Sequence, residues 1–123
     1  VLGADGARGI VINTASITAY EGQVGQGAYV ASKGAIVALT LQAAREFAAK
    51  GVRVMAIAPG LFATPMASEV PPEVVEAITS DAIFPRRFGQ PDDFANMVLA
   101  IIANPMLNGE VIRLDGALRM APR

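Results

Sequence analysis

Residues 28–58 read AYVASKGAIVALTLQAAREFAAKGVRVMAIA. As far as Lys50 the segment is rich in alanine and free of proline, and its large apolar side chains recur at helical spacing. Lys50 followed by Gly51 is a typical helix end. The rest of the segment is a mainly apolar run that Pro59-Gly60 terminates. We therefore predict a long helix over 28–50 and a strand over 52–58.

The segments on either side continue this alternation. Gly9–Asn13 is a short run rich in β-branched residues, typical of a strand buried on both faces of a parallel sheet. Residues 14–26 are polar and rich in glycine, so we interpret them as a loop. Further on, we predict a short helix over Glu73–Ala82, a longer helix over Pro91–Ala103 and a third strand over Glu110–Leu114. Alternating strands and helices indicate an α/β fold with a doubly wound parallel sheet.

The length of the chain suits a single domain, and its sheet looks thin. The chain has 123 residues, of which 53% are hydrophobic. Three parallel strands would leave long edges uncovered. The opening residues 1–6 contain no initiator methionine and are typical of the end of a helix-to-strand loop. We therefore expect the chain to begin inside a longer protein and to be incomplete as a stable unit.

Composition excludes several classes of function. The net charge is -1, with 10 Lys and Arg against 11 Asp and Glu, so there is no basic footprint for nucleic acid. The chain has no Cys and no His, which removes disulfides and most zinc sites, and we predict no metal. No apolar run reaches the roughly 20 residues of a membrane span. We expect a cytoplasmic protein, or one of the mitochondrial matrix in a eukaryote.

Three side chains at one end of the predicted sheet suit acid–base chemistry on an alcohol. Tyr29 and Lys33 are four residues apart, so they share a helix face. A free tyrosine has a pKa of about 10, too high for efficient proton transfer near neutrality, and a nearby ammonium favours the phenolate. The hydroxyl of Ser16, just after the first strand, can hydrogen-bond a carbonyl or alkoxide oxygen. Together they suit removal of an alcohol proton while a hydride leaves to a cofactor.

Each of these features alone occurs often by chance, but their combination resembles one family. Tyr29-Val30-Ala31-Ser32-Lys33 is similar to the Tyr-x-Ala-Ser-Lys signature of the short-chain dehydrogenases/reductases. Ser16 lies at the spacing of the family's catalytic serine, Pro59-Gly60 follows the next strand, and residues 108–116 resemble the family's closing strand and Asp-Gly turn. The resemblance covers nearly the whole chain and implies the C-terminal half of a Rossmann-like fold.

The resemblance assigns roles to the catalytic candidates. Tyr29 would be the general acid/base. Lys33 would favour the phenolate and hydrogen-bond the nicotinamide ribose. Ser16 would orient the substrate oxygen.

It also implies residues for binding. Pro59, Gly60, the main chain of Phe62 and the side chain of Thr64 would hold the nicotinamide. Two glutamines near the substrate mouth, Gln23 and Gln26, are candidates for substrate binding, and the alternative is that they are solvated loop residues.

Residues 21–26, 58–62 and 104–117 resemble one branch of the family, the type II 3-hydroxyacyl-CoA dehydrogenases. This implies NAD as cofactor, with NADP as the alternative, and an acyl-CoA as substrate in a homotetramer. A hydroxysteroid or a 3-oxoacyl carrier protein is the alternative substrate. Residues 63–85 would form a lid over an acyl chain, or would pack in the core.

Three parts of the family's site are not found in the sequence. They are the Gly-rich turn that holds the pyrophosphate, the residue that selects NAD or NADP, and a fourth catalytic residue, an Asn. We therefore expect the missing N-terminal half to be a partner of these residues, and the chain to be inactive alone. The competing hypothesis is a non-catalytic fragment or assembly scaffold that keeps the fold and packs through the alanine-rich helix.

Overall fold

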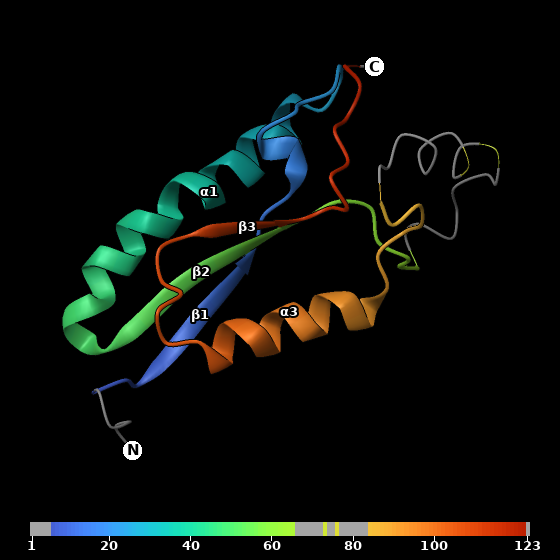
Figure 1. Cartoon of the computed structure of the whole chain (residues 1–123). Helices are drawn as coiled ribbons and strands as arrows, with labels where there is room; N and C mark the ends of the chain where they lie inside the picture. The colour runs from blue at the N-terminus through green and yellow to red at the C-terminus, as the bar shows by residue number, and fades with distance from the viewer. Residues whose placement is uncertain (1–5, 66–72, 74–75, 77–83, 123) are drawn as a thin grey trace.

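The computed structural model describes residues 6–65, 73, 76 and 84–122 of the chain. These residues form a parallel sheet with a helix on each face (Figure 1). In chain order the elements are β1 (Gly9–Thr14), the 3-10 turn η1 (Ile17–Ala19), α1 (Gly27–Phe47), the 3-10 turn η2 (Ala48–Lys50), β2 (Val52–Pro59), α3 (Pro91–Ala103) and β3 (Val111–Leu114).

The core is built on β2, which lies between β1 and β3 and pairs in parallel with both. Its residues 54–58 are at most 1% exposed, because a helix covers each face of the sheet. Side chains alternate along a strand, so even-numbered positions pack toward α1 and odd-numbered positions toward α3. The α1 side holds Val54, Ala56 and Ala58, and the α3 side holds Met55 and Ile57 against Ile101.

Local chemistry fixes the turns at the far end of the sheet from the predicted site. Gly51 ends η2 with a φ of 68°, and a Cβ there would collide with the carbonyl oxygen of Gly6, so glycine is required. Arg53 donates hydrogen bonds to four carbonyl oxygens at the end of α3 and just beyond it, those of Ile101, Ile102, Asn104 and Leu107, at 2.8–3.0 Å. The guanidinium thus satisfies carbonyls that the helix end leaves unpaired.

The observed elements confirm the predicted fold class and order. The strands predicted over 9–13, 52–58 and 110–114 each lie within one residue of the observed ends, and Pro59 is the last residue of β2 rather than the first of a turn. The predicted loop over 14–26 contains the short turn η1. The helix predicted over 28–50 is α1 followed by the tighter turn η2. Of the helix predicted over Glu73–Ala82 only residues 73 and 76 are described, both as helical, and most of the proposed lid lies outside the described residues.

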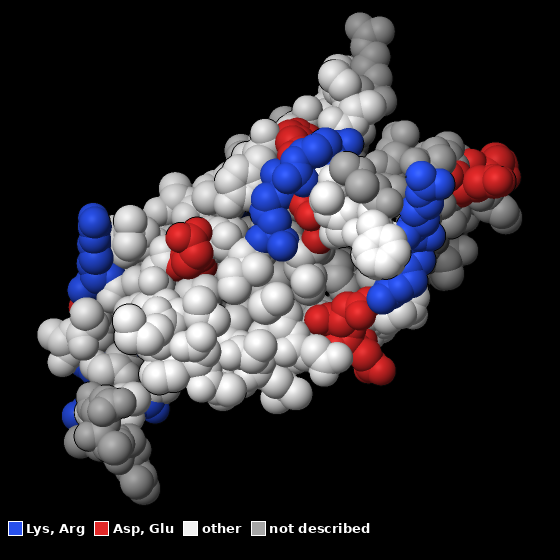
Figure 2. All heavy atoms as spheres, viewed as in Figure 1, with Lys and Arg blue, Asp and Glu red and all other residues white. Residues whose placement is uncertain are grey.

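The surface of α3 carries no charge beyond its first turn. Residues 94–103 contain no Lys, Arg, Asp or Glu, and Figure 2 shows the uncharged surface that results. Leu99 and Ile102 on this helix are 62% and 51% exposed. Among the described residues, no helix combines the length and hydropathy needed to cross a bilayer.

Candidate active site

The residues predicted for the site lie at the carboxyl ends of the parallel strands, where an open α/β sheet binds ligands. Ser16 follows β1, and Gly60 follows β2. The loop after β1 runs through η1 into the first turn of α1, which carries Tyr29. A Cβ on Gly22 in this loop would lie 3.2 Å from the side chain of Val30, so the loop packs closely on the helix it precedes.

Tyr29 and Lys33 lie together on α1, as their spacing requires. The Nζ atom of Lys33 lies 5.7 Å from the centre of the Tyr29 ring and donates a 2.9 Å hydrogen bond to the carbonyl oxygen of Thr14 at the end of β1. The ammonium is therefore tied to the sheet on one side and lies near the phenol on the other. Tyr29 is 49% exposed, so its hydroxyl can reach a bound molecule.

Ser16 is held by a neighbour that sequence reasoning missed. Its side chain is buried and caps η1, and its Oγ accepts hydrogen bonds from the main-chain N–H of Thr18 at 3.2 Å and from the Thr18 hydroxyl at 2.8 Å. A serine hydroxyl that accepts two bonds still has one proton to donate. Ser-x-Thr directly after a strand is a typical capping pattern, so the partner could have been found from sequence.

The turn after β2 is too crowded for a side chain. The N–H of Gly60 donates to the carbonyl oxygen of Leu114 at 3.0 Å. A Cβ on Gly60 would lie 2.9 Å from Cβ and 3.0 Å from Cα of Asp115, which is shorter than real contacts allow. The turn therefore requires glycine at position 60, because a side chain would have no space. The contact with Asp115 determines the position of the turn.

Phe62 presents free main-chain groups. Its neighbours bond to Gly89, with Ala63 N–H donating to the Gly89 oxygen at 2.8 Å and Gly89 N–H donating to the Leu61 oxygen at 2.9 Å. Main-chain groups alternate in direction along an extended segment, so the N–H and C=O of Phe62 point away from Gly89. No described residue bonds to them. Thr64, also predicted to contact the cofactor, is exposed two residues further on.

The two glutamines bond within the protein. Gln23 Nε2 donates to the carbonyl oxygen of Ala121 at 3.0 Å, and Gln26 Nε2 donates to Gln23 Oε1 at 3.3 Å. Gln26 Oε1 is buried and has no partner among the described residues. Gln23 thus ties the loop before α1 to the C-terminal segment, and its role toward a substrate remains a prediction.

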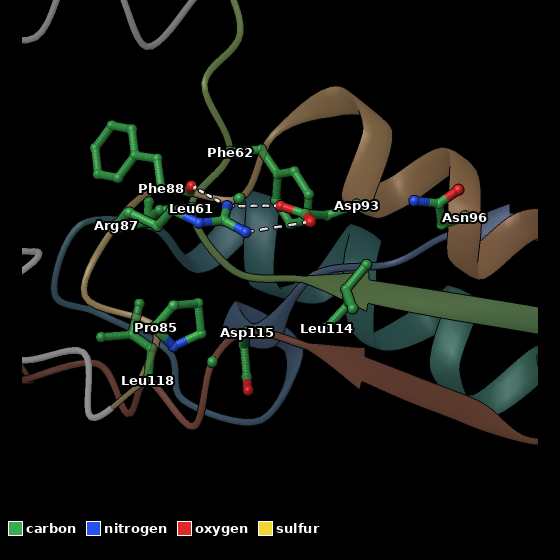
Figure 3. A pocket seen from close by; sticks show the side chains of 12 residues that line it. Leu61, Phe62, Pro85, Arg87, Phe88, Asp93, Asn96, Leu114, Asp115 and Leu118 are labelled. Atoms are coloured by element: carbon green, nitrogen blue, oxygen red, sulfur yellow. Dashed lines mark hydrogen bonds and ion pairs between the residues drawn. The ribbon is translucent and has the colours of Figure 1, made fainter.

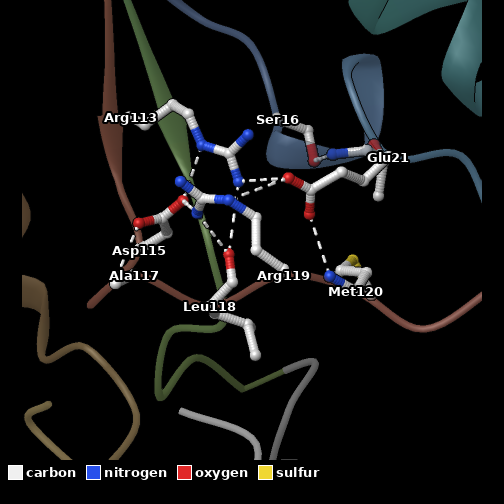
Figure 4. A network of polar contacts seen from close by, with 9 residues as sticks. Ser16, Glu21, Arg113, Asp115, Ala117, Leu118, Arg119 and Met120 are labelled. Carbon is white, nitrogen blue, oxygen red and sulfur yellow. Dashed lines mark hydrogen bonds and ion pairs between the residues drawn. The ribbon is translucent and has the colours of Figure 1, made fainter. Parts of the chain in front are cut away.

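A network of ion pairs beside the site was not foreseen from the sequence (Figure 4). Arg113 pairs with Glu21 and with Asp115, at 2.7 Å each, and Arg119 lies 3.4 Å from Glu21 and 3.2 Å from Asp115. Burial alone would raise the pKa of Glu21, but the N–H of Met120 and the Arg113 guanidinium outweigh it and lower that pKa. The network therefore keeps Glu21 ionised to a lower pH than an ordinary glutamate.

The cavity drawn in Figure 3 lies beside α3, and Tyr29 does not line it. It has a volume of about 360 Å³, and of the residues predicted for the site only Phe62 lines it. At its rim Arg87 pairs with Asp93 at 2.6 Å. That hydrogen bond lowers the pKa of Asp93, as does the N–H of Gln90 at the start of α3. We place the candidate site by its chemistry, at Ser16, Tyr29 and Lys33, and not by this cavity.

Comparison with known proteins decides the family. Residues 2–118 match the family described as enoyl-(acyl carrier protein) reductase, a group of short-chain dehydrogenases/reductases. The chain belongs to the short-chain dehydrogenase/reductase family. Human 3-hydroxyacyl-CoA dehydrogenase type-2 is a similar member of this family, 59% identical over 95% of the chain and 45% of the human protein. The chain thus spans about half the length of the curated relatives it matches.

Solved structures of short-chain dehydrogenases/reductases agree with the fold. The 3-hydroxyacyl-CoA dehydrogenase type-2 of Mycobacterium avium is 43% identical, with a TM-score of 0.97 over the whole chain and 48% of that structure. A 7α-hydroxysteroid dehydrogenase complexed with NADH and a 7-oxo bile acid is 27% identical, with a TM-score of 0.85 over 94% of the chain and 46% of that structure. The doubly wound, Rossmann-like fold predicted from the sequence is confirmed.

Proposed function

We propose that this chain forms the nicotinamide side of the active site of an NAD-dependent dehydrogenase that interconverts (S)-3-hydroxyacyl-CoA and 3-oxoacyl-CoA. One observation carries the proposal. Lys33 Nζ lies 5.7 Å from the Tyr29 ring and is fixed by the Thr14 oxygen, at the sheet end where Ser16 also lies. This is a base, a charge beside it and a hydrogen-bond donor in one place.

The proton chemistry follows from these side chains. In the oxidation direction, Tyr29 as phenolate accepts the proton of the substrate hydroxyl. The Lys33 ammonium stabilises the negative charge of that phenolate. The free proton of the Ser16 hydroxyl hydrogen-bonds the substrate oxygen and holds it toward Tyr29. When bound, a nicotinamide would accept the hydride that leaves the carbon bearing this hydroxyl.

The residues after β2 fit a nicotinamide carboxamide. The N–H and C=O of Phe62, which bond to no described residue, complement the oxygen and the amide hydrogens of such a group. Gly60, directly after β2, adds no side chain to this turn. An ammonium has three N–H donors. Lys33 uses one of them to bond the Thr14 oxygen, so two are left for ribose hydroxyls. We propose NAD on this basis and on the likeness to the NADH-bound hydroxysteroid dehydrogenase, with NADP as the alternative.

The substrate class rests on the relatives. The human and mycobacterial proteins are named 3-hydroxyacyl-CoA dehydrogenases, and the human one is 59% identical. A 3-oxoacyl-[acyl-carrier protein] reductase from Brucella melitensis is 32% identical, and the hydroxysteroid dehydrogenase 27%. A 3-hydroxyacyl-CoA is therefore the first substrate to test, and a carrier-protein thioester or a hydroxysteroid the second.

The decisive experiment replaces Tyr29 with Phe in the full-length protein and follows NADH absorbance on acetoacetyl-CoA. Loss of the acid/base should lower kcat by roughly 100-fold or more. Tyr20→Phe is a matched control, because Tyr20 is the other tyrosine of the chain and is 46% exposed against 49% for Tyr29. Equal turnover in wild type and Tyr29→Phe would exclude the assignment. Turnover on a 7-oxo steroid or on acetoacetyl carrier protein alone would revise the substrate.

We further propose a homotetramer. Two apolar surfaces support this, the face of α1 that exposes Ala31, Ala35, Ala38 and Leu39, and the uncharged surface of α3. Sedimentation of the full-length protein should give four copies, and a monomer would contradict the proposal. The same surfaces would serve an assembly scaffold, but a scaffold would be indifferent to Tyr29→Phe.

A further inference from the structure

The loop between β1 and α1 determines how two of the proposed catalytic side chains face each other. Ser16 lies at its start, and Tyr29 lies just beyond its end, in the first turn of α1. Residues 20–26 between them include no helix or strand. The position of this segment is therefore set by what it bonds to elsewhere in the protein.

Its anchors come from the C-terminal segment, residues 118–122. The carboxylate of Glu21 accepts from the N–H of Met120 at 2.9 Å, and the N–H of Val24 donates to the carbonyl oxygen of Pro122 at 3.1 Å. Gln23 adds its bond to Ala121. The partners are nearly 100 residues apart in sequence, so tertiary structure alone brings them together.

Arg113, just before the end of β3, joins these anchors to the turn after β2 (Figure 4). Its Nη2 pairs with Glu21 Oε1 at 2.7 Å, while its Nε donates to Asp115 Oδ2 at 2.7 Å. The same side chain donates to the Leu118 oxygen at 3.2 Å. One guanidinium therefore contacts the loop before α1, the end of β3 and the C-terminal segment.

Asp115 connects Arg113 to the turn at Gly60, next to the proposed cofactor site. Its Cα and Cβ are the atoms that leave Gly60 no room for a side chain, and its carboxylate is only 7% exposed. A shift of Asp115 would therefore displace the turn that leads from Gly60 to Phe62.

We infer that Arg113 is a positioning residue, which fixes the loop between Ser16 and Tyr29 relative to the turn at Gly60. The inference rests on the proposed function, because that function gives catalytic and cofactor roles to the residues so fixed. Arg113 acts through Glu21 and Asp115. Its planar group bonds two carboxylates in different directions at once, which a lysine ammonium on a flexible stem does much less well.

The test compares Arg113→Lys with Arg53→Lys in the full-length protein. Both arginines make several hydrogen bonds, but those of Arg53 lie at the opposite end of the sheet. We expect Arg113→Lys to lower kcat roughly tenfold or more with little change in KM, because misplaced groups lose transition-state contacts. Arg53→Lys should lower the unfolding temperature and leave kcat intact. Amide hydrogen exchange should become faster in residues 20–26 and 60–63 for Arg113→Lys, and in 101–107 for Arg53→Lys.

A double mutant adds an independent check. Glu21→Gln combined with Arg113→Lys should lower kcat little further than Arg113→Lys alone, because both changes break the same contact. Unchanged exchange in 20–26 and 60–63, an unchanged kcat in Arg113→Lys, or an equal loss of kcat in Arg53→Lys would each overturn the inference. A wild-type protein without turnover would overturn the proposed function instead. In that case the exchange data for Arg113→Lys would test the inference. Faster exchange in residues 20–26 and in residues 60–63 would support it.

Discussion

Replacing Gly60 with alanine should damage the site without touching a polar group. The added Cβ would lie 2.9 Å from Cβ of Asp115, about 0.6 Å inside the shortest comfortable carbon–carbon separation of about 3.5 Å. Because Cα of Asp115 is also within 3.0 Å, a side-chain rotation cannot relieve the contact and the backbone must move. Overpacking of this kind costs about 1–3 kcal/mol of unfolding free energy.

The same shift should weaken the proposed cofactor site. Loss of one hydrogen bond between the main chain after Gly60 and the nicotinamide costs about 1.4 kcal/mol, so the shift should raise the Kd for NADH roughly tenfold. Urea unfolding and NADH fluorescence titration on the full-length protein measure the two effects. Gly9→Ala is the control, since a Cβ on Gly9 meets no described residue within 4 Å. If Gly60→Ala matched Gly9→Ala in both assays, the close contact with Asp115 would be refuted.

Three further changes test the fold and its electrostatics. Arg53→Gln should lower the free energy of unfolding in urea by about 1.5–3 kcal/mol, because carbonyls at the end of α3 lose a charged donor. A decrease below about 0.5 kcal/mol would contradict this. Ile101→Ala, at a fully buried position, should cost about 2–5 kcal/mol in the same assay, and a negligible cost would mean that α3 does not pack as described. Pairing with Arg87 lowers the pKa of Asp93. The stabilisation of the folded state by this pair is therefore complete above about pH 5, and it is lost as the pH falls through the folded-state pKa of Asp93. Asp93→Asn should therefore flatten the acid side of the stability–pH curve, and high salt should do so too in the wild type; an unchanged curve would exclude the pair as a contributor.

The sequence predicts the framework because its signals are local. The apolar run over 52–58 and the helical spacing over 28–50 determine β2 and α1, and the interval of four between Tyr29 and Lys33 places them on one face. The capping pattern at Ser16 was equally local, and was open to sequence reasoning. These features need only the backbone geometry of a few neighbouring residues.

The ion pairs around Arg113 could not be predicted in the same way. Glu21 and Arg113 are widely separated in sequence, and each by itself is typical of a solvated surface residue. Their contact depends on where β3 ends relative to the loop before α1, which no periodicity encodes. The bond from Gln23 to Ala121 has the same origin. Sequence patterns therefore identify the candidate catalytic side chains but not the side chains that hold them in place.

The alanines on one face of β2 set the spacing between two layers of the molecule. Ala56 and Ala58 are fully buried beneath Ile36 and Val37 of α1, so at this point the strand contributes only methyl groups to the contact with the helix. Two of the smallest side chains in the core thus determine the distance between the start of α1 and the strand ends. This distance allows the Lys33 ammonium to reach the Thr14 carbonyl. A larger residue at Ala58 would push α1 away from the sheet, so an apolar position outside the proposed site should change the geometry that we propose for proton transfer.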